Sequence, residues 1–202
     1  MSFISLNFVL LFACAFILYH VLPHRYKKAV LLAASFVFIG FYHIAFLAIA
    51  LFISLATFYL GRWMGQAKQE RTIQKIYVSG VCFLITSWLA SRYADLLIDA
   101  HFLFPLGISF YTFQAISYLT EIYWQGEKPE KNLTDFLVYM LFFMKFLSGP
   151  IERAADMLPQ LKSDKAVRYS SMTYGMKLMV VGLVKKLLLA DYIGSYIDGI
   201  FN

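Results

Sequence analysis

The 202 residues of this chain are 60% hydrophobic and 18% aromatic, and only 15% are charged, well below the roughly 25% of an ordinary water-soluble domain. Together with a mean hydropathy of +0.65, this composition excludes a water-soluble globular fold and predicts an all-α bundle that crosses a membrane several times. The net charge of +6 does not indicate nucleic-acid binding, because the basic residues lie between apolar runs and not beside stacking aromatics.

The apolar runs predict one membrane domain over residues 1–202, with an uncleaved first span because no positive charge precedes it. We expect spans at about 3–22, 29–42, 44–60, 75–97, 105–124 and 171–190, and a half-span at 134–147, where twelve apolar residues rise only about 18 Å. The apolar run of 29–60 is too long for one upright helix and is divided around 40–43. The chain stops without a polar tail, so we expect the domain to be incomplete.

Basic loops predict the orientation of these spans. Arg25, Lys27 and Lys28 follow the first apolar run, and residues 61–75 form a second basic loop after the third run. Because Lys and Arg are enriched in cytoplasmic loops, we expect both loops inside and the N-terminus outside.

Shorter features lie in the second half of the chain. Asn132 or Thr134 is expected to cap the helix of the half-span. Residues 151–161 mix charged and apolar side chains and are expected to lie at the membrane interface, with Pro159 limiting any helix.

Two segments contain helix-breaking residues, Pro105 with Gly107 and Gly149 with Pro150. At membrane depth a broken helix is tolerated only where protein shields the backbone or where the backbone lines a water-filled cavity. A plain interfacial turn is the alternative, and the Pro and Gly content alone favours it.

A row of polar residues follows the first break. Tyr111, Gln114, Tyr118 and Glu121 are spaced by three, four and three, which places them on one face of a helix. A buried carboxylate is usually paired, so Glu121 and Lys145 are candidates for each other or for a polar cavity. The alternative, equally weighted, is that both lie near the interface and extend to water.

The residues alone identify no catalytic group. The four histidines lie at or near predicted span ends, without the spacing of a metal site or a nearby activated nucleophile, and each is expected to be interfacial: His20, His24, His43 and His101. Cys14 and Cys82 lie in apolar runs and indicate neither a disulfide nor a metal site.

Four blocks of sequence carry a resemblance to a known family. Residues 104–118 read FPLGISFYTFQAISY and continue through Glu121 to Tyr123; they are followed by 128–136, by SGPIER at 148–153 with Asp156, and by VKK at 184–186 with residues 190–191. In order and spacing these blocks resemble the N-terminal portion of the membrane-bound O-acyltransferase (MBOAT) family, specifically its bacterial alginate O-acetyltransferase branch.

The resemblance implies a multi-helix enzyme with a tunnel, in the inner membrane of a bacterium, that passes acetyl from a cytoplasmic donor such as acetyl-CoA or an acyl carrier to an exported polysaccharide. It implies no bound cofactor. It also implies partners in membrane lipid and in exopolysaccharide-modification proteins on the outer side. The motif residues with structural roles would be Pro105, Gly107, Gly149, Pro150, Arg153, Lys185 and Lys186, and the elements around Arg153 would meet the donor.

The family's catalytic histidine lies in a more C-terminal helix, so no residue of this chain takes that role, and the chain alone is expected to be inactive. Two other classes of function stay open. A transporter or channel component would show the same broken helices and polar row, and a non-catalytic membrane scaffold of an exopolysaccharide complex would need neither donor nor acceptor site.

Overall fold

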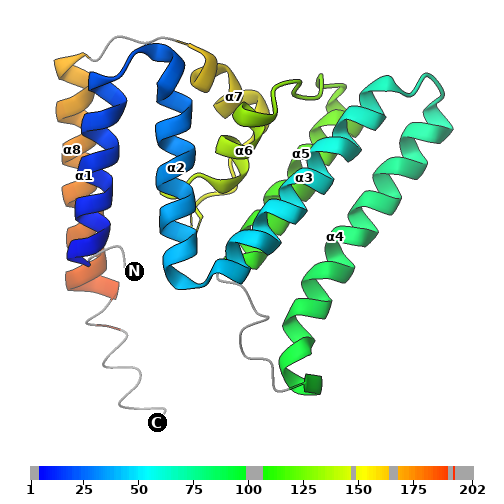
Figure 1. Cartoon of the computed structure of the whole chain (residues 1–202), viewed down its shortest axis with the longest axis horizontal. Coiled ribbons are helices and arrows are strands. Elements are labelled where there is room, and N and C mark those ends of the chain that lie inside the picture. The colour runs from blue at the N-terminus through cyan, green and yellow to red at the C-terminus, as the bar shows by residue number, and fades with distance from the viewer. Residues whose placement is uncertain (1–4, 99–106, 147–148, 164–167, 191–192, 194–202) are drawn as a thin grey trace. The chain divides into compact units, whose positions relative to one another are not determined.

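The structure, a computed structural model, describes residues 5–98, 107–146, 149–163, 168–190 and 193. Every element within these residues is a helix, which confirms the all-α prediction for them (Figure 1). The chain divides into two compact units, Met1–Ser163 and Asp164–Asn202. The first contains α1 Leu6–Val21, α2 His24–Tyr42, α3 Ile44–Gln66, α4 Glu70–Ile98, α5 Ile108–Gln125, α6 Leu133–Leu141 and α7 Ala154–Lys162.

Short polar caps set the boundaries of several helices. Ser5 accepts the N–H of Phe8 at the start of α1, and Asn132, one of the two expected caps, accepts the N–H groups of the first turn of α6. The long apolar run divides at His43, one residue after α2 ends, and the His43 ring accepts the N–H of Ala45 in α3. Caps of this kind satisfy N–H groups that have no partner within the helix.

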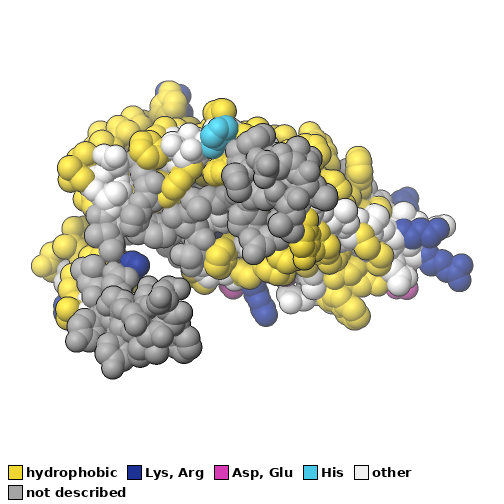
Figure 2. Space-filling view, turned by 90° about the horizontal axis from the view of Figure 1, so that it is seen from below, with side chains coloured by type: hydrophobic (Ala, Val, Ile, Leu, Met, Phe, Trp, Pro, Cys, Tyr) yellow, Lys and Arg dark blue, Asp and Glu magenta, His cyan; other side chains and the backbone are white. Residues whose placement is uncertain are grey.

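Two described helices, α3 and the part of α4 up to Ser91, are long and apolar enough to cross a membrane. Only 11% of the most apolar stretch of α4 is buried within the protein, so its hydrophobic side chains face outward. Figure 2 shows hydrophobic side chains over much of the described part of one face. The full set of crossings stays a prediction.

The core of the first unit forms around α5, which packs against α3, α4 and α6 (Figure 1). Glycines on α3 permit the close approach of two neighbours. A Cβ atom on Gly61 would lie 2.7 Å from Cε1 of Tyr118, and one on Gly65 would overlap the ring of Pro129. The spacing of four residues puts both glycines on one face of the helix, and this face receives α5 and the loop that follows it.

Helix α6 ends at Leu141, six residues before the predicted end of the apolar helix at residue 147. The reason is that side chains from two other helices take up the backbone groups whose hydrogen bond would continue α6. In a continued helix the N–H of Phe143 would bind the carbonyl of Tyr139; instead it donates to Oγ of Ser35 at 3.2 Å, and the Tyr139 carbonyl accepts Nε2 of Gln114 at 2.8 Å. Side chains of α2 and α5 thus replace the next bond of α6.

Residues 154–162 form a helix, α7, which continues through Pro159. The expectation that Pro159 limits a helix in this segment is therefore wrong. Proline lacks an N–H, so it removes one bond to the carbonyl four residues earlier, here that of Ala155. The buried side chains of Ala154, Met157 and Leu158 hold the helix against the core despite this loss.

The second unit contains α8 Tyr169–Val184, followed by a π-helical segment, Lys185–Ala190. None of the described residues of α8 is buried. Lys185 and Lys186 are exposed at the start of the π-helical segment.

Candidate functional site: a polar interior and a charged cavity

The four residues of the predicted polar row lie on α5, and all four are buried. Gln114 donates to the carbonyl of Tyr139, and the Tyr118 hydroxyl accepts the N–H of Glu130 at 3.0 Å. The Tyr111 hydroxyl has no hydrogen-bond partner among the described residues. The row therefore faces protein, as a polar face in a lipid environment must.

The two predicted breaks lie close together. Gly107 adopts a positive φ of 74° before α5, a conformation that favours glycine, and a Cβ there would clash with the carbonyl oxygen of Phe146. The Phe146 ring stacks on Tyr111. Tyr111 also lines a small cavity with Gly149 and Pro150. Pro105 and Ser148 lie outside the described residues.

Lys145 and Glu121 do not pair with each other; each has another partner, and each lines a cavity. The Lys145 ammonium lies 3.5 Å from a carboxylate oxygen of Glu152 and 4.6 Å from the centre of the Tyr139 ring, and it donates to Sδ of Met157. Lys145 is 7% exposed and Glu121 is 3% exposed. Neither side chain extends to the protein surface.

Glu121 binds the beginning of α7. Its Oε2 accepts the N–H of Ala155 at 3.3 Å, and its Oε1 accepts the hydroxyl of Ser117 at 3.2 Å. Arg153, the N-cap residue of α7, supplies no side-chain cap. A carboxylate is favourable at a helix N-terminus, where N–H groups are unpaired and the helix dipole is positive. Glu121 therefore caps α7 from another helix, and the exposed side chain of Arg153 is left for other contacts.

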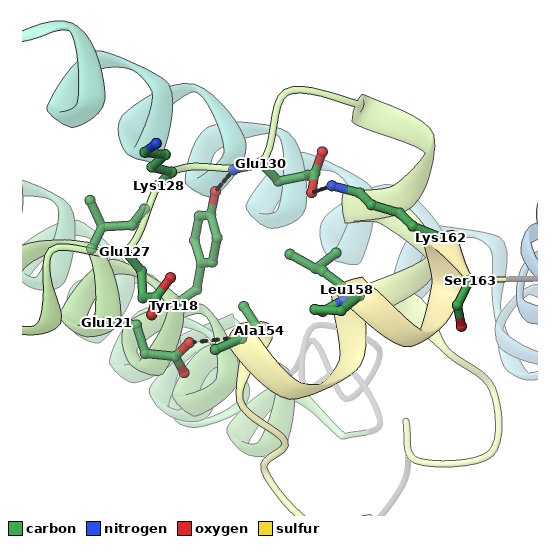
Figure 3. A pocket seen from close by; sticks show the side chains of 12 residues that line it. Tyr118, Glu121, Glu127, Lys128, Glu130, Ala154, Leu158, Lys162 and Ser163 are labelled. Carbon is green, nitrogen blue, oxygen red and sulfur yellow. Dashed lines mark hydrogen bonds and ion pairs between the residues drawn. The ribbon is translucent and has the colours of Figure 1, made fainter.

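A cavity of about 580 Å³ lies between α5, the loop 126–132 and α7 (Figure 3). Part of its wall is apolar, and charged side chains come from the loop, from α5 (Glu121) and from α7 (Lys162). The lining residues are Tyr118, Glu121, Ile122, Glu127, Lys128, Glu130, Ala154, Ala155, Leu158, Pro159, Lys162 and Ser163.

Glu130 is held in this cavity by an ion pair and by hydrogen bonds from the backbone. Its Oε2 accepts the Lys162 ammonium at 2.6 Å, and its Oε1 accepts the N–H groups of Lys131 and Asn132, each at 2.9 Å. Burial by itself would raise the pKa of Glu130, but the hydrogen bond from Lys162 and those from the backbone outweigh it and hold the pKa below 4.5. Glu130 is therefore ionised at neutral pH.

This cavity is not indicated by any local sequence pattern. Glu127, Lys128, Glu130 and Lys162 look like ordinary solvated charges in a polar loop and a short helix. The one available signal was the acidic residue placed two positions before the Asn132 cap, where backbone N–H groups are unpaired. Among the described residues, no group of three or more His, Cys, Asp or Glu side chains could hold a metal ion.

The chain is 31% identical over 205 residues to the probable alginate O-acetylase AlgI of Pseudomonas fluorescens, covering 100% of this chain and 41% of that protein. It is 31% identical over 124 residues to the peptidoglycan O-acetyltransferase of Helicobacter pylori, covering 48% of this chain and 24% of the relative.

A third relative is the teichoic acid D-alanyltransferase of Streptococcus thermophilus, 33% identical over 92 residues, which cover 45% of this chain and 22% of the relative. No family model and no solved structure matches the chain. The chain spans less than half the length of the curated relatives that it matches along its whole length. The comparisons confirm the resemblance inferred from the motifs: this chain is similar, from end to end, to the alginate-type branch of the membrane-bound O-acyltransferases.

Proposed function

We propose that this chain is part of a membrane O-acyltransferase that moves an acyl group, acetyl, from a cytoplasmic donor to hydroxyls of an exported polysaccharide. The observation that carries the proposal is the similarity of the whole chain to proteins named alginate O-acetylase. The partial relatives named for peptidoglycan and teichoic acid support the broader class of reaction, acyl transfer to a cell-envelope polymer.

The reaction we assign to the whole protein is a thioester-to-ester exchange. The carbon–sulfur bond of an acetyl thioester breaks, an ester bond forms to the polysaccharide hydroxyl, and the hydroxyl proton passes through a base to the departing thiolate. The donor would be acetyl-CoA or an acyl carrier. The resemblance puts the base, a histidine, outside this stretch of sequence, so we propose that the 202-residue chain alone does not transfer acetyl.

Within this scheme we assign the charged cavity to the donor side of the protein. The loop 126–132, which lines it, follows the predicted span 105–124, and in the predicted orientation that span ends on the cytoplasmic side. The cavity combines apolar side chains with the ammonium group of Lys128, while Lys162 is paired with Glu130, and Glu121 and Glu127 add negative charge. Its volume of about 580 Å³ is within the range of small-molecule sites, and this size supports the assignment. The buried row that includes Tyr111 and Gln114 would line part of the path toward the acceptor.

We further propose that the protein lies in the bacterial inner membrane as a multi-pass protein with its N-terminus outside. Lipid would then cover the exposed apolar side chains of α3 and α4. Exopolysaccharide-modification proteins and the polysaccharide acceptor would be met on the outer side.

A deletion experiment tests the proposal. The gene is removed from its bacterium, and the exopolysaccharide is assayed for acetate released by mild alkali and for total polymer secreted. We expect ester-linked acetate to fall to background, polymer secretion to be kept, and the intact gene to restore acetylation. Loss of secretion with normal acetylation of the remaining polymer would instead favour a transporter or a scaffold.

A further inference from the structure

Helix α7 forms one wall of the cavity, and its two ends are held differently. The first half is buried: Ala154, Met157 and Leu158 are each less than 10% exposed. The carboxylate of Glu121 holds the N–H of Ala155 in the same half. Releasing this end would expose apolar side chains and remove a hydrogen bond from the buried Glu121 carboxylate, and both changes are costly. The first half of α7 is therefore fixed.

The last turn of α7 is held more weakly. Pro159 removes the hydrogen bond to the Ala155 carbonyl, at the point where burial ends: Pro159 and Gln160 are exposed and Leu161 is only partly buried. The strong polar contact of this turn is the pair between Lys162 and Glu130, 2.6 Å apart. The other side-chain hydrogen bonds given for this turn lie within α7 and its C-cap, so among the described contacts one ion pair and one partly buried side chain hold it to the rest of the first unit.

The two side chains of this pair differ in how freely they can move. Glu130 is 6% exposed and is fixed by hydrogen bonds from Lys131 and Asn132 and by its own N–H, which donates to the Tyr118 hydroxyl. Lys162 is 49% exposed, at the end of a long flexible side chain. Figure 3 shows Lys162 reaching from α7 to Glu130 beside the cavity. Opening of the pair would move Lys162 and leave Glu130 in place.

We propose that the Lys162–Glu130 ion pair is a reversible contact that holds the last turn of α7 against the cavity and so controls entry to the cavity. Pro159, Lys162 and Ser163 all line the cavity, so movement of this turn about Pro159 widens the opening while the first half of α7 stays packed. When the pair is broken, the buried Glu130 carboxylate lacks its countercharge. Opening of the turn lets water reach this carboxylate, and this favours the open form. This role of the ion pair does not depend on acetyl transfer, so it can be tested without an activity assay.

The test measures entry directly. Ala154, which lines the cavity and is 6% exposed, is replaced by cysteine in the full chain, and its reaction with a water-soluble maleimide is followed by peptide mass spectrometry in detergent micelles. We expect Lys162→Met to speed labelling of this cysteine about fivefold, the effect of roughly 1 kcal/mol. The native cysteines Cys14 and Cys82 lie in apolar helices, so both are replaced by alanine and the engineered thiol is the one that is followed.

Three further samples complete the test. Lys131→Met, a change of an exposed lysine that binds Glu130 only through its backbone, should leave the rate unchanged. Lys162→Arg, which keeps the positive charge that pairs with Glu130, should keep labelling slow, and 0.5 M KCl should speed labelling of the wild-type pair by screening it. An unchanged rate in Lys162→Met, or in salt if that variant does not fold, would overturn the proposal.

Discussion

The backbone N–H of Phe143 donates to Oγ of Ser35, 3.2 Å away and 108 positions earlier in the sequence. This bond stands where α6 would have continued, and it joins α2 to the segment that leads to the second break. Ser35 is completely buried, and its hydroxyl also donates to the carbonyl of Leu31.

Ser35→Ala should therefore destabilise the protein by about 1–3 kcal/mol, because the buried N–H of Phe143 loses its acceptor. Ser54→Ala is a matched control: Ser54 is equally buried, and its hydroxyl bond is to the carbonyl four residues earlier in its own helix. Denaturant titration in detergent micelles should show a much smaller loss for Ser54→Ala. Equal losses would mean that the bond to Phe143 contributes nothing.

Glu121 should contribute to stability as the cap of α7. We expect Glu121→Ala to cost about 1–3 kcal/mol, because the N–H of Ala155 loses its acceptor, and Glu121→Gln to cost less, because the amide keeps an acceptor oxygen. Hydrogen exchange at the Ala155 amide measures the effect locally. Glu127→Gln, an exposed change on the same cavity, is the control and should leave that amide unaffected.

The two glycines with positive φ separate backbone strain from steric contact. Gly107 and Gly126 have φ values of 74° and 68°, and a Cβ on Gly126 would meet nothing within 4 Å. Gly126→Ala should cost about 1–2 kcal/mol for the left-handed conformation alone. Gly107→Ala should cost clearly more, because its Cβ also meets the Phe146 carbonyl. The thermal unfolding midpoints of the two variants measure this difference. Equal shifts of the midpoint would contradict the contact with the Phe146 carbonyl.

Lys145 should be easier to replace than its partner. Lys145→Met removes a buried charge and leaves Glu152, which is 47% exposed and can be solvated, so we expect stability to be unchanged or raised. Glu152→Gln leaves the buried ammonium without its countercharge and should cost about 1–3 kcal/mol. Denaturant titration of both variants checks the order, and a larger loss for Lys145→Met would contradict it.

The pH dependence of stability should contain a contribution from Glu130. Because contacts with Lys162 and the backbone lower its pKa below 4.5 in the folded protein, its contribution is present above about pH 4.5 and is lost as the pH falls through the lowered pKa. We expect the wild type to be more stable than Glu130→Gln at pH 6, with the difference shrinking below pH 4.5. A difference that does not change between pH 6 and pH 3 would contradict this assignment.

Local features of the fold could be predicted because their causes are local. Three features each follow from residues within a few positions of one another: the turn between α2 and α3 at His43, the cap at Asn132 and the break at Gly107. The spacing of Tyr111 and Glu121 likewise predicted that they share one helix face, because helical geometry depends only on position in the sequence.

The remaining features depend on contacts between distant segments. Nothing near Leu141 indicates that Ser35 and Gln114 end α6 there. The partner of Lys145 could not be predicted because Glu152 lies in a segment whose path depends on how α7 packs. The same packing creates the cavity, so its lining residues appear only in the folded chain.

Acetyl transfer by the purified full-length gene product is the most direct test of the central claim. The protein is placed in lipid vesicles with an exopolysaccharide that carries free hydroxyls, and acetyl-CoA or an acetylated carrier protein is supplied with a labelled acetyl group. Our account predicts alkali-labile acetyl on the polymer that depends on the protein and on one of these donors. Transport of the polymer across the vesicle membrane without any gain of acetyl would contradict it.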